Sequence, residues 1–127
     1  MAPHPFRAAV EARDLDALCA CLAEDVVLNS PVAFKPFEGR AAASQVLTFV
    51  AATFEDFRYV DELAEDGRTA LIFRARVGDK EVQGLDLVHT DDDGLIDELT
   101  VMVRPLSGAI ALAEAMGPKV AAAGLKA

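Results

Sequence analysis

Residues 80–105 read KEVQGLDLVHTDDDGLIDELTVMVRP, and this stretch decides the fold. Two apolar runs, 82–89 and 95–104, flank the acidic tetrapeptide DDDG at 91–94. Each run is long enough for a β-strand, and Gly94 readily adopts the positive φ that a tight turn between strands requires. The stretch therefore predicts two paired antiparallel strands.

One carboxylate, Asp86, lies in the middle of the first run, between Leu85 and Leu87. Two interpretations of this residue stay open. Asp86 faces the interior, where desolvation raises its pKa and lets it donate a hydrogen bond to a ligand oxygen. Alternatively, it pairs with an arginine such as Arg74 or Arg76, across the sheet or at a subunit contact.

The two segments before this pair also predict strands. In residues 69–77, Arg74 and Arg76 alternate with apolar side chains and are expected to point outward. Residues 54–63 form the other strand, and three of its side chains are expected to share one face: Phe57, Tyr59 and Asp61.

The remaining segments predict helices, one short strand and an apolar loop. In chain order they are a helix in two pieces over 4–23 with Asp14 as the second N-cap, a strand at 26–28, a loop at 31–39, a helix at 40–53, and a helix at 106–125 interrupted at Gly108, Gly117-Pro118 and Gly124. The loop contains Val32, Phe34 and Phe37, so we expect it to cover an apolar interior. Helices placed before a meander of strands are typical of an α+β domain.

Composition limits the class of protein. A chain of 127 residues with 53% hydrophobic residues predicts one domain, 1–127, with a single core. The net charge of −9 argues against partners such as nucleic acid or an anionic membrane surface. The first residues, MAPHPFRAAVEARD, lack the apolar region of a signal peptide, so we predict a cytoplasmic protein.

Neither the cysteines nor the histidines form a recognisable metal motif. Cys19 and Cys21 would lie about 200° apart on a helix, so we expect buried, inert thiols. His89 is expected on the face of the strand opposite to Asp86, and therefore at the surface or an interface. We therefore predict neither a metal site nor a cofactor.

Three segments of the chain resemble the nuclear transport factor two-like superfamily and, within it, the SnoaL-like group. They are AEDVVLNSP (23–31), PVAFKPFEGRAA (31–42) and DDDGLIDELTVMVRP (91–105), and the resemblance extends over about residues 5–116. It implies a cone in which a strongly bent, mostly antiparallel sheet wraps around the N-terminal helices (a cystatin-like roll) and encloses a pocket. This fold carries isomerases, epoxide hydrolases, cyclases, dehydratases and non-catalytic binding modules, so it does not by itself fix an activity.

The resemblance to ketosteroid isomerases can be tested at three positions. These enzymes use a tyrosine on the first helix, an aspartate base before a proline and a protonated aspartate on the penultimate strand. Here the resemblance places Phe6, Ser30 and Asp86 at those positions. Only the third is retained, and a serine hydroxyl cannot abstract a carbon-bound proton unaided near pH 7.

Two other enzyme groups of this fold place carboxylates elsewhere. Limonene epoxide hydrolases use Arg-x-Asp on the third long strand and an aspartate on the last, where this chain has Arg74-Ala75-Arg76 and Val101. SnoaL-like cyclases also place an acid-base aspartate near Val101. Arg74 and Asn29 still match the hydrolase pattern, but both carboxylates are missing.

The residues support two hypotheses for function. The first is a cofactor-independent isomerase, cyclase or dehydratase that uses Asp86 as its catalytic acid or hydrogen-bond donor. The second is a non-catalytic module that binds a small apolar ligand in the same pocket. The candidate ligand-binding residues are Phe6, Asn29, Ser30, Tyr59, Arg74 and Val101, and strand alternation lets only one of Asn29 and Ser30 point inward.

The outer sheet face predicts a homodimer. Leu85, Leu87, Thr100 and Met102 share the parity opposite to Asp86. They would make a surface too apolar for a monomer.

Overall fold

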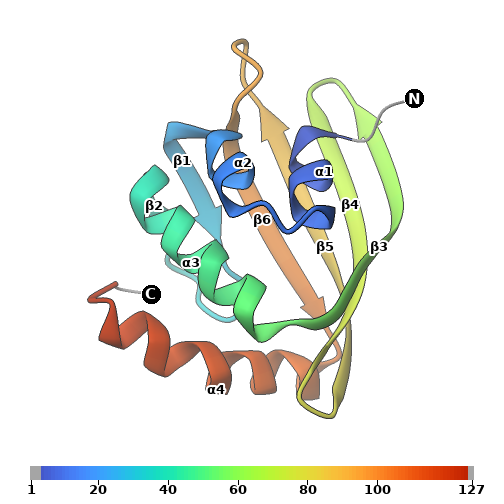
Figure 1. The fold of residues 1–127 in the computed structure, drawn as a ribbon, viewed down its shortest axis with the longest axis vertical. Helices are drawn as coiled ribbons and strands as arrows, with labels where there is room; N and C mark the ends of the chain where they lie inside the picture. The colour runs from blue at the N-terminus through green and yellow to red at the C-terminus, as the bar shows by residue number, and fades with distance from the viewer. Residues whose placement is uncertain (1–3, 126–127) are drawn as a thin grey trace.

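The computed structural model describes residues 4–125, and the predicted domain limits of 1–127 extend beyond this range. The described part is an α+β fold, as predicted (Figure 1). Its elements are α1 (Pro5–Glu11), α2 (Leu15–Ala20), β1 (Leu22–Asn29), β2 (Phe37–Glu38), α3 (Arg40–Thr53), β3 (Glu55–Glu65), β4 (Arg68–Val77), β5 (Lys80–Thr90), β6 (Ile96–Arg104) and α4 (Leu106–Ala122).

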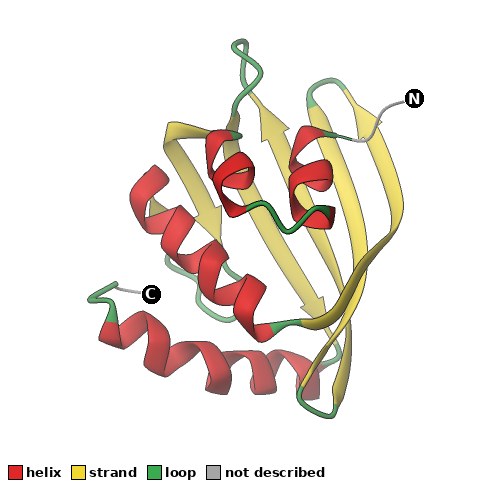
Figure 2. Ribbon diagram, in the orientation of Figure 1, coloured by secondary structure: helices red, strands yellow, loops and turns green. Residues whose placement is uncertain are grey.

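The strands form one six-stranded, bent sheet in the order β2-β1-β6-β5-β4-β3. Neighbouring strands are antiparallel except β1 and β6, which pair in parallel. α1, α2 and α3 lie against the concave face, and α4 crosses one end of the sheet below α3 (Figures 1 and 2). The sheet does not close into a barrel, and the result is the cone-like, cystatin-like fold that the resemblance implied.

The hairpin of β5 and β6 lies near the centre of this sheet, and its two strands pair antiparallel as predicted. Asp86 pairs with Leu71 on one side and with Val101 on the other. Gly84 is required on β5 because a Cβ atom there would lie 2.0 Å from the ring of Phe73. This close approach brings the Phe73 ring against Phe54 and Phe57, so the aromatic side chains pack as one group above the strand.

Several predicted boundaries were wrong. β1 begins at Leu22 instead of residue 26, because pairing with β6 extends it beyond its apolar centre. The short strand β2 lies inside the predicted loop, where Phe37 pairs with Leu28. α4 continues through Pro118, because Leu112, Met116 and Val120 keep one buried face across it. Proline removes one backbone donor there without ending the helix.

Two predictions about side chains were also wrong. Cys19 and Cys21 are half-buried instead of buried. Asp61 does not share the face of Tyr59, because the register shifts between these residues. The shift leaves Asp61 exposed and places Glu62 opposite Leu71, on the inner side.

No helix within residues 4–125 combines the length and the apolar character needed to cross a membrane.

Candidate functional site

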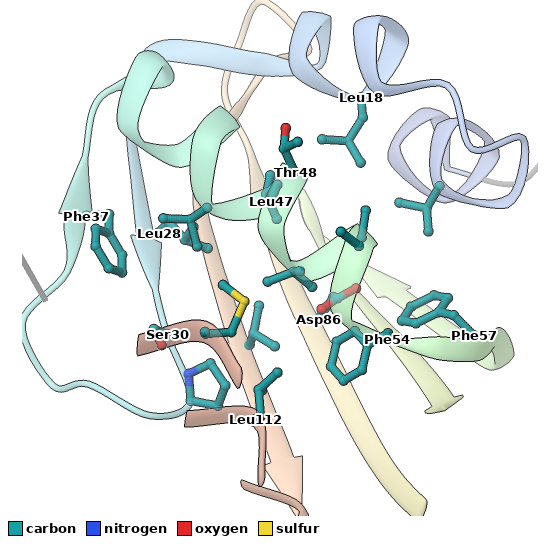
Figure 3. A pocket seen from close by; sticks show the side chains of 18 of the residues that line it. Leu18, Leu28, Ser30, Phe37, Leu47, Thr48, Phe54, Phe57, Asp86 and Leu112 are labelled. Carbon is teal, nitrogen blue, oxygen red and sulfur yellow. The ribbon is translucent and has the colours of Figure 1, made fainter. Parts of the chain in front are cut away.

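The concave face of the sheet and the helices enclose a cavity of about 690 Å³. Its walls are mostly apolar and come from every helix and from the inner face of the sheet (Figure 3). Among the lining side chains are Leu18, Leu28, Leu47, Phe54, Phe57 and Leu112. A cavity of this volume accommodates a small molecule of drug or lipid-fragment size.

Asp86 is the buried acidic group of this cavity. Its side chain is 7% exposed, and Figure 3 shows the carboxyl group near Phe54 and Phe57. Desolvation raises the pKa of Asp86 to about 7, although the hydrogen bond from Tyr59 acts in the opposite direction. The carboxyl group therefore changes its charge near neutral pH.

The partner of Asp86 is Tyr59 on β3. The Tyr59 hydroxyl donates a hydrogen bond of 2.7 Å to Oδ2 of Asp86. Burial, and then the negative charge of Asp86, raise the pKa of Tyr59 far above its ordinary value, so the phenol stays protonated and remains a donor. Oδ1 of Asp86 has no hydrogen-bond partner within residues 4–125.

The second interpretation of the sequence was an arginine partner for Asp86, and no arginine within residues 4–125 pairs with it. Arg76 forms ion pairs with Glu55 and Asp56, the first two residues of β3. Arg74 is exposed on the outer face and does not line the cavity. Its outward orientation was predicted from strand alternation, and it removes Arg74 from the cavity site.

Asn29 and Ser30 separate as strand alternation predicted. The Asn29 amide donates to Oγ1 of Thr100 at 2.9 Å and to Oε2 of Glu98 at 3.3 Å, which keeps it away from the cavity. Ser30 lines the cavity, and its hydroxyl accepts a hydrogen bond from the backbone of Val32. Asn29 is therefore not part of the cavity wall.

Phe6 and Val101 line the cavity, as does most of the apolar segment around residues 31–33. Phe6 is buried on α1, and Val101 lies directly beside Asp86 on β6. The loop only partly covers the interior, because Phe34 is fully exposed at its tip. Within residues 4–125, the cavity wall thus supplies apolar contact around one buried acidic group, Asp86.

Sequence reasoning missed two polar features of the cavity. The first is the pairing of Tyr59 with Asp86, which depends on the register of the strand between them. The second is a polar rim formed by Glu11, Arg13 and Asp14. For the Tyr59–Asp86 pair, the sequence offered one indication: strand alternation places Tyr59, the single tyrosine, on the same face as Phe57.

The model of the SnoaL-like domain matches residues 5–99 of the chain. The chain belongs to the SnoaL-like domain family. The predicted family is therefore confirmed, over a match that includes Phe6, Ser30, Tyr59 and Asp86.

Solved structures of similar proteins agree with this assignment. The SnoaL-like chain is 44% identical to a steroid delta-isomerase from Pseudomonas aeruginosa, with a TM-score of 0.87 over 92% of this chain and 87% of that one. It is 33% identical to an uncharacterised bacterial protein with a cystatin-like fold from Silicibacter pomeroyi, with a TM-score of 0.87 over 92% and 83% of the two chains.

A more distant structure supports the fold alone. An NTF2-like protein of unknown function from Mesorhizobium loti is 24% identical, with a TM-score of 0.69 over 79% of this chain and 85% of that one. No curated protein gives a significant match. The comparisons therefore support a family of small-molecule isomerase-type and binding proteins, without naming a ligand.

Proposed function

We propose that this SnoaL-like protein binds a small, mostly apolar molecule that carries one carbonyl oxygen, and that Asp86 donates the hydrogen bond to that oxygen. The observation that carries the proposal is the buried pair of Asp86 and Tyr59 in an otherwise apolar part of the cavity. Because Tyr59 already donates to Oδ2, a proton on Oδ1 is the donor left for a ligand.

Burial makes this donor effective. A hydrogen bond inside an apolar cavity is electrostatically stronger than one in water, and a ligand oxygen would give Oδ1 a polar partner. With a pKa of about 7, Asp86 is protonated in a large share of molecules at neutral pH. A neutral carboxylic acid in an apolar site acts as a hydrogen-bond donor in ketosteroid isomerases, the enzymes that this chain resembles at Asp86.

Catalysis is a second candidate function, and the 44% identity to a steroid delta-isomerase favours it. In that case Asp86 would act as the acid that stabilises an oxygen on which negative charge develops. Proton abstraction from carbon also needs a base. Within residues 4–125, the other carboxylates that line the cavity are Glu11 and Asp14, and both are exposed at its rim. We therefore place binding first.

A fluorescent ketone tests the binding proposal. Prodan, a naphthyl ketone, changes its emission in apolar surroundings and on accepting a hydrogen bond. We expect wild-type protein to bind it at pH 6, and Asp86→Ala to weaken binding roughly tenfold, since one hydrogen bond contributes about 1–1.5 kcal/mol. Asp97→Ala, which removes a carboxylate paired with His89 outside the cavity, is the matched control.

Absence of prodan binding to the wild type, or equal binding to Asp86→Ala, would refute the proposal. Catalysis is tested in parallel by incubating wild type and Asp86→Asn with hydroxy-ketone, steroid-like and epoxide substrates. Turnover by the wild type that Asp86→Asn loses would make the protein an enzyme. Ligand binding without turnover of any of these would leave the binding function alone.

We also propose that two copies associate through the outer face of the sheet. Leu85 pairs with Met102 and Leu87 with Thr100 across β5 and β6, so their side chains form one apolar strip. Met102 is 51% exposed. Contact with a second copy would remove this strip from water. Neither the binding proposal nor this one requires a metal or a cofactor.

A further inference from the structure

The hydroxyl of Tyr59 reaches Asp86 only if its ring is held in one orientation. The ring stands edge-on to Phe57, with 5.0 Å between centroids, and edge-on to Phe73 at 6.4 Å. These contacts support the ring from the side of β3 and β4. A further support comes from α1, where the guanidinium carbon of Arg7 lies 5.8 Å from the ring centroid.

Arg7 is itself fixed by two carboxylates. Its Nη1 donates to Oε1 of Glu62 at 3.1 Å, and its Nε donates to Oε1 of Glu11 at 3.2 Å. Glu62 is on the inner side of the sheet because the register shifts just after Tyr59. The irregularity in β3 thus places a carboxylate where it can hold the guanidinium over the ring. Arg7 and Glu62 are about three-quarters buried, which protects their ion pair from solvent screening.

We propose that Arg7 is a positioning residue of the cavity: held by Glu62 and Glu11, its guanidinium packs on the Tyr59 ring and keeps the phenol hydroxyl on Oδ2 of Asp86. The attraction between a guanidinium and an aromatic face is strongest when both are partly desolvated, as Arg7 and Tyr59 are here. This proposal rests on the proposed function of Asp86. When the Tyr59 hydroxyl occupies Oδ2, Oδ1 is the oxygen left to carry the proton for the ligand.

The charges around the Tyr59 ring agree with an indirect role. Arg7, Glu11 and Glu62 approach it from α1 and β3, and Asp86 approaches its hydroxyl from β5. The causes that move the pKa of Asp86 are burial and the Tyr59 hydrogen bond. Arg7 is therefore expected to act on Asp86 through the tyrosine, and this distinguishes positioning from a direct effect of its charge.

A double-mutant cycle in the ligand-free protein tests the inference. The pKa of Asp86 is followed by NMR with ¹³C-labelled aspartate carboxyls, assigned with Asp86→Asn. We expect Tyr59→Phe to raise this pKa, because the ionised form loses its donor. Arg7→Met should raise it in the same direction by about half a unit or more, and should have no further effect in the Tyr59→Phe background. Arg76→Met, which breaks ion pairs with two exposed carboxylates that do not line the cavity, is the control.

Three results would overturn the inference: no change in the pKa of Asp86 for Arg7→Met, an equal change in the Tyr59→Phe background, or no change for Tyr59→Phe itself. A purely structural role would lower the melting temperature and leave the pKa unchanged. If Arg7→Met does not fold, Glu62→Ala removes the acceptor that holds the guanidinium on β3 and should raise the pKa of Asp86 in the same way. Because no ligand is present, failure of prodan binding would refute the proposed function without affecting this result.

Discussion

At the scale of single residues, the chain depends on one acid whose environment the sequence only partly revealed. Asp86 could be singled out because a carboxylate in an apolar strand is unusual. The sequence left two interpretations of it open, and the structure agrees with the one in which it faces the interior. Its partner could not be predicted, because Tyr59 lies 27 positions away and reaches it across another strand. Arg74 was predicted as a ligand-binding residue by resemblance, while alternation along its own strand correctly placed it outside.

The raised pKa of Asp86 predicts a pH dependence of stability. From pH 4 to pH 7 the unfolded chain loses the Asp86 proton while the folded chain retains it, so the free energy of unfolding falls as pH rises. Between pH 5 and pH 8 the wild type should lose about 2 to 3 kcal/mol relative to Asp86→Asn. Urea unfolding of both proteins measures this difference, and other carboxyl groups cancel in the comparison. Parallel pH profiles would show that Asp86 titrates normally.

At the scale of elements, the local pattern of apolar residues predicted the helices and strands that depend on residues close together in the sequence. The hairpin, the strand before it and the helix at 40–53 were found where the apolar pattern indicated. The parallel pairing of β1 with β6 and the register shift in β3 arise from contacts between distant segments. No local pattern could predict them, and the shift is what places Glu62 on the inner side.

Gly108 lets α4 pack closely against β5 of the sheet. A Cβ atom at this position would lie 2.3 Å from Cγ1 of Val82 on β5. Gly108→Ala should therefore destabilise the fold by about 1 to 3 kcal/mol, although alanine favours the helix itself. Adding Val82→Ala should cost less than it does in the wild type, because it removes the clash. Thermal unfolding of the four proteins measures this coupling, and strict additivity would mean that the helix does not dock as described.

At the scale of the whole molecule, the fold could be predicted because composition, element order and resemblance agreed. The cavity followed from the fold, since a bent sheet around helices leaves a space at its centre. The direction of the side chains that line it depended on register and could be predicted only where alternation was regular. Ser30 and Asn29 follow that rule, whereas Asp61 lies after an irregularity and does not.

The association of two copies is also a prediction at this scale. Sedimentation velocity at micromolar concentration should give a dimer for the wild type. Leu85→Glu should give a monomer, because it buries an unpaired charge in the apolar strip of the outer face. Ile110→Glu, which changes an exposed residue on α4, should remain dimeric. A monomeric wild type would exclude this interface.

The pH dependence of prodan affinity tests the central claim most directly, because only protonated Asp86 can donate to a ketone. The apparent Kd should be lowest below pH 6 and rise by about tenfold or more as the pH passes 7, because the ionised carboxylate has no proton to donate. In Asp86→Asn, whose amide donates at every pH, the Kd should be independent of pH from 5.5 to 9. A wild-type Kd that is equally flat over this range would contradict the account.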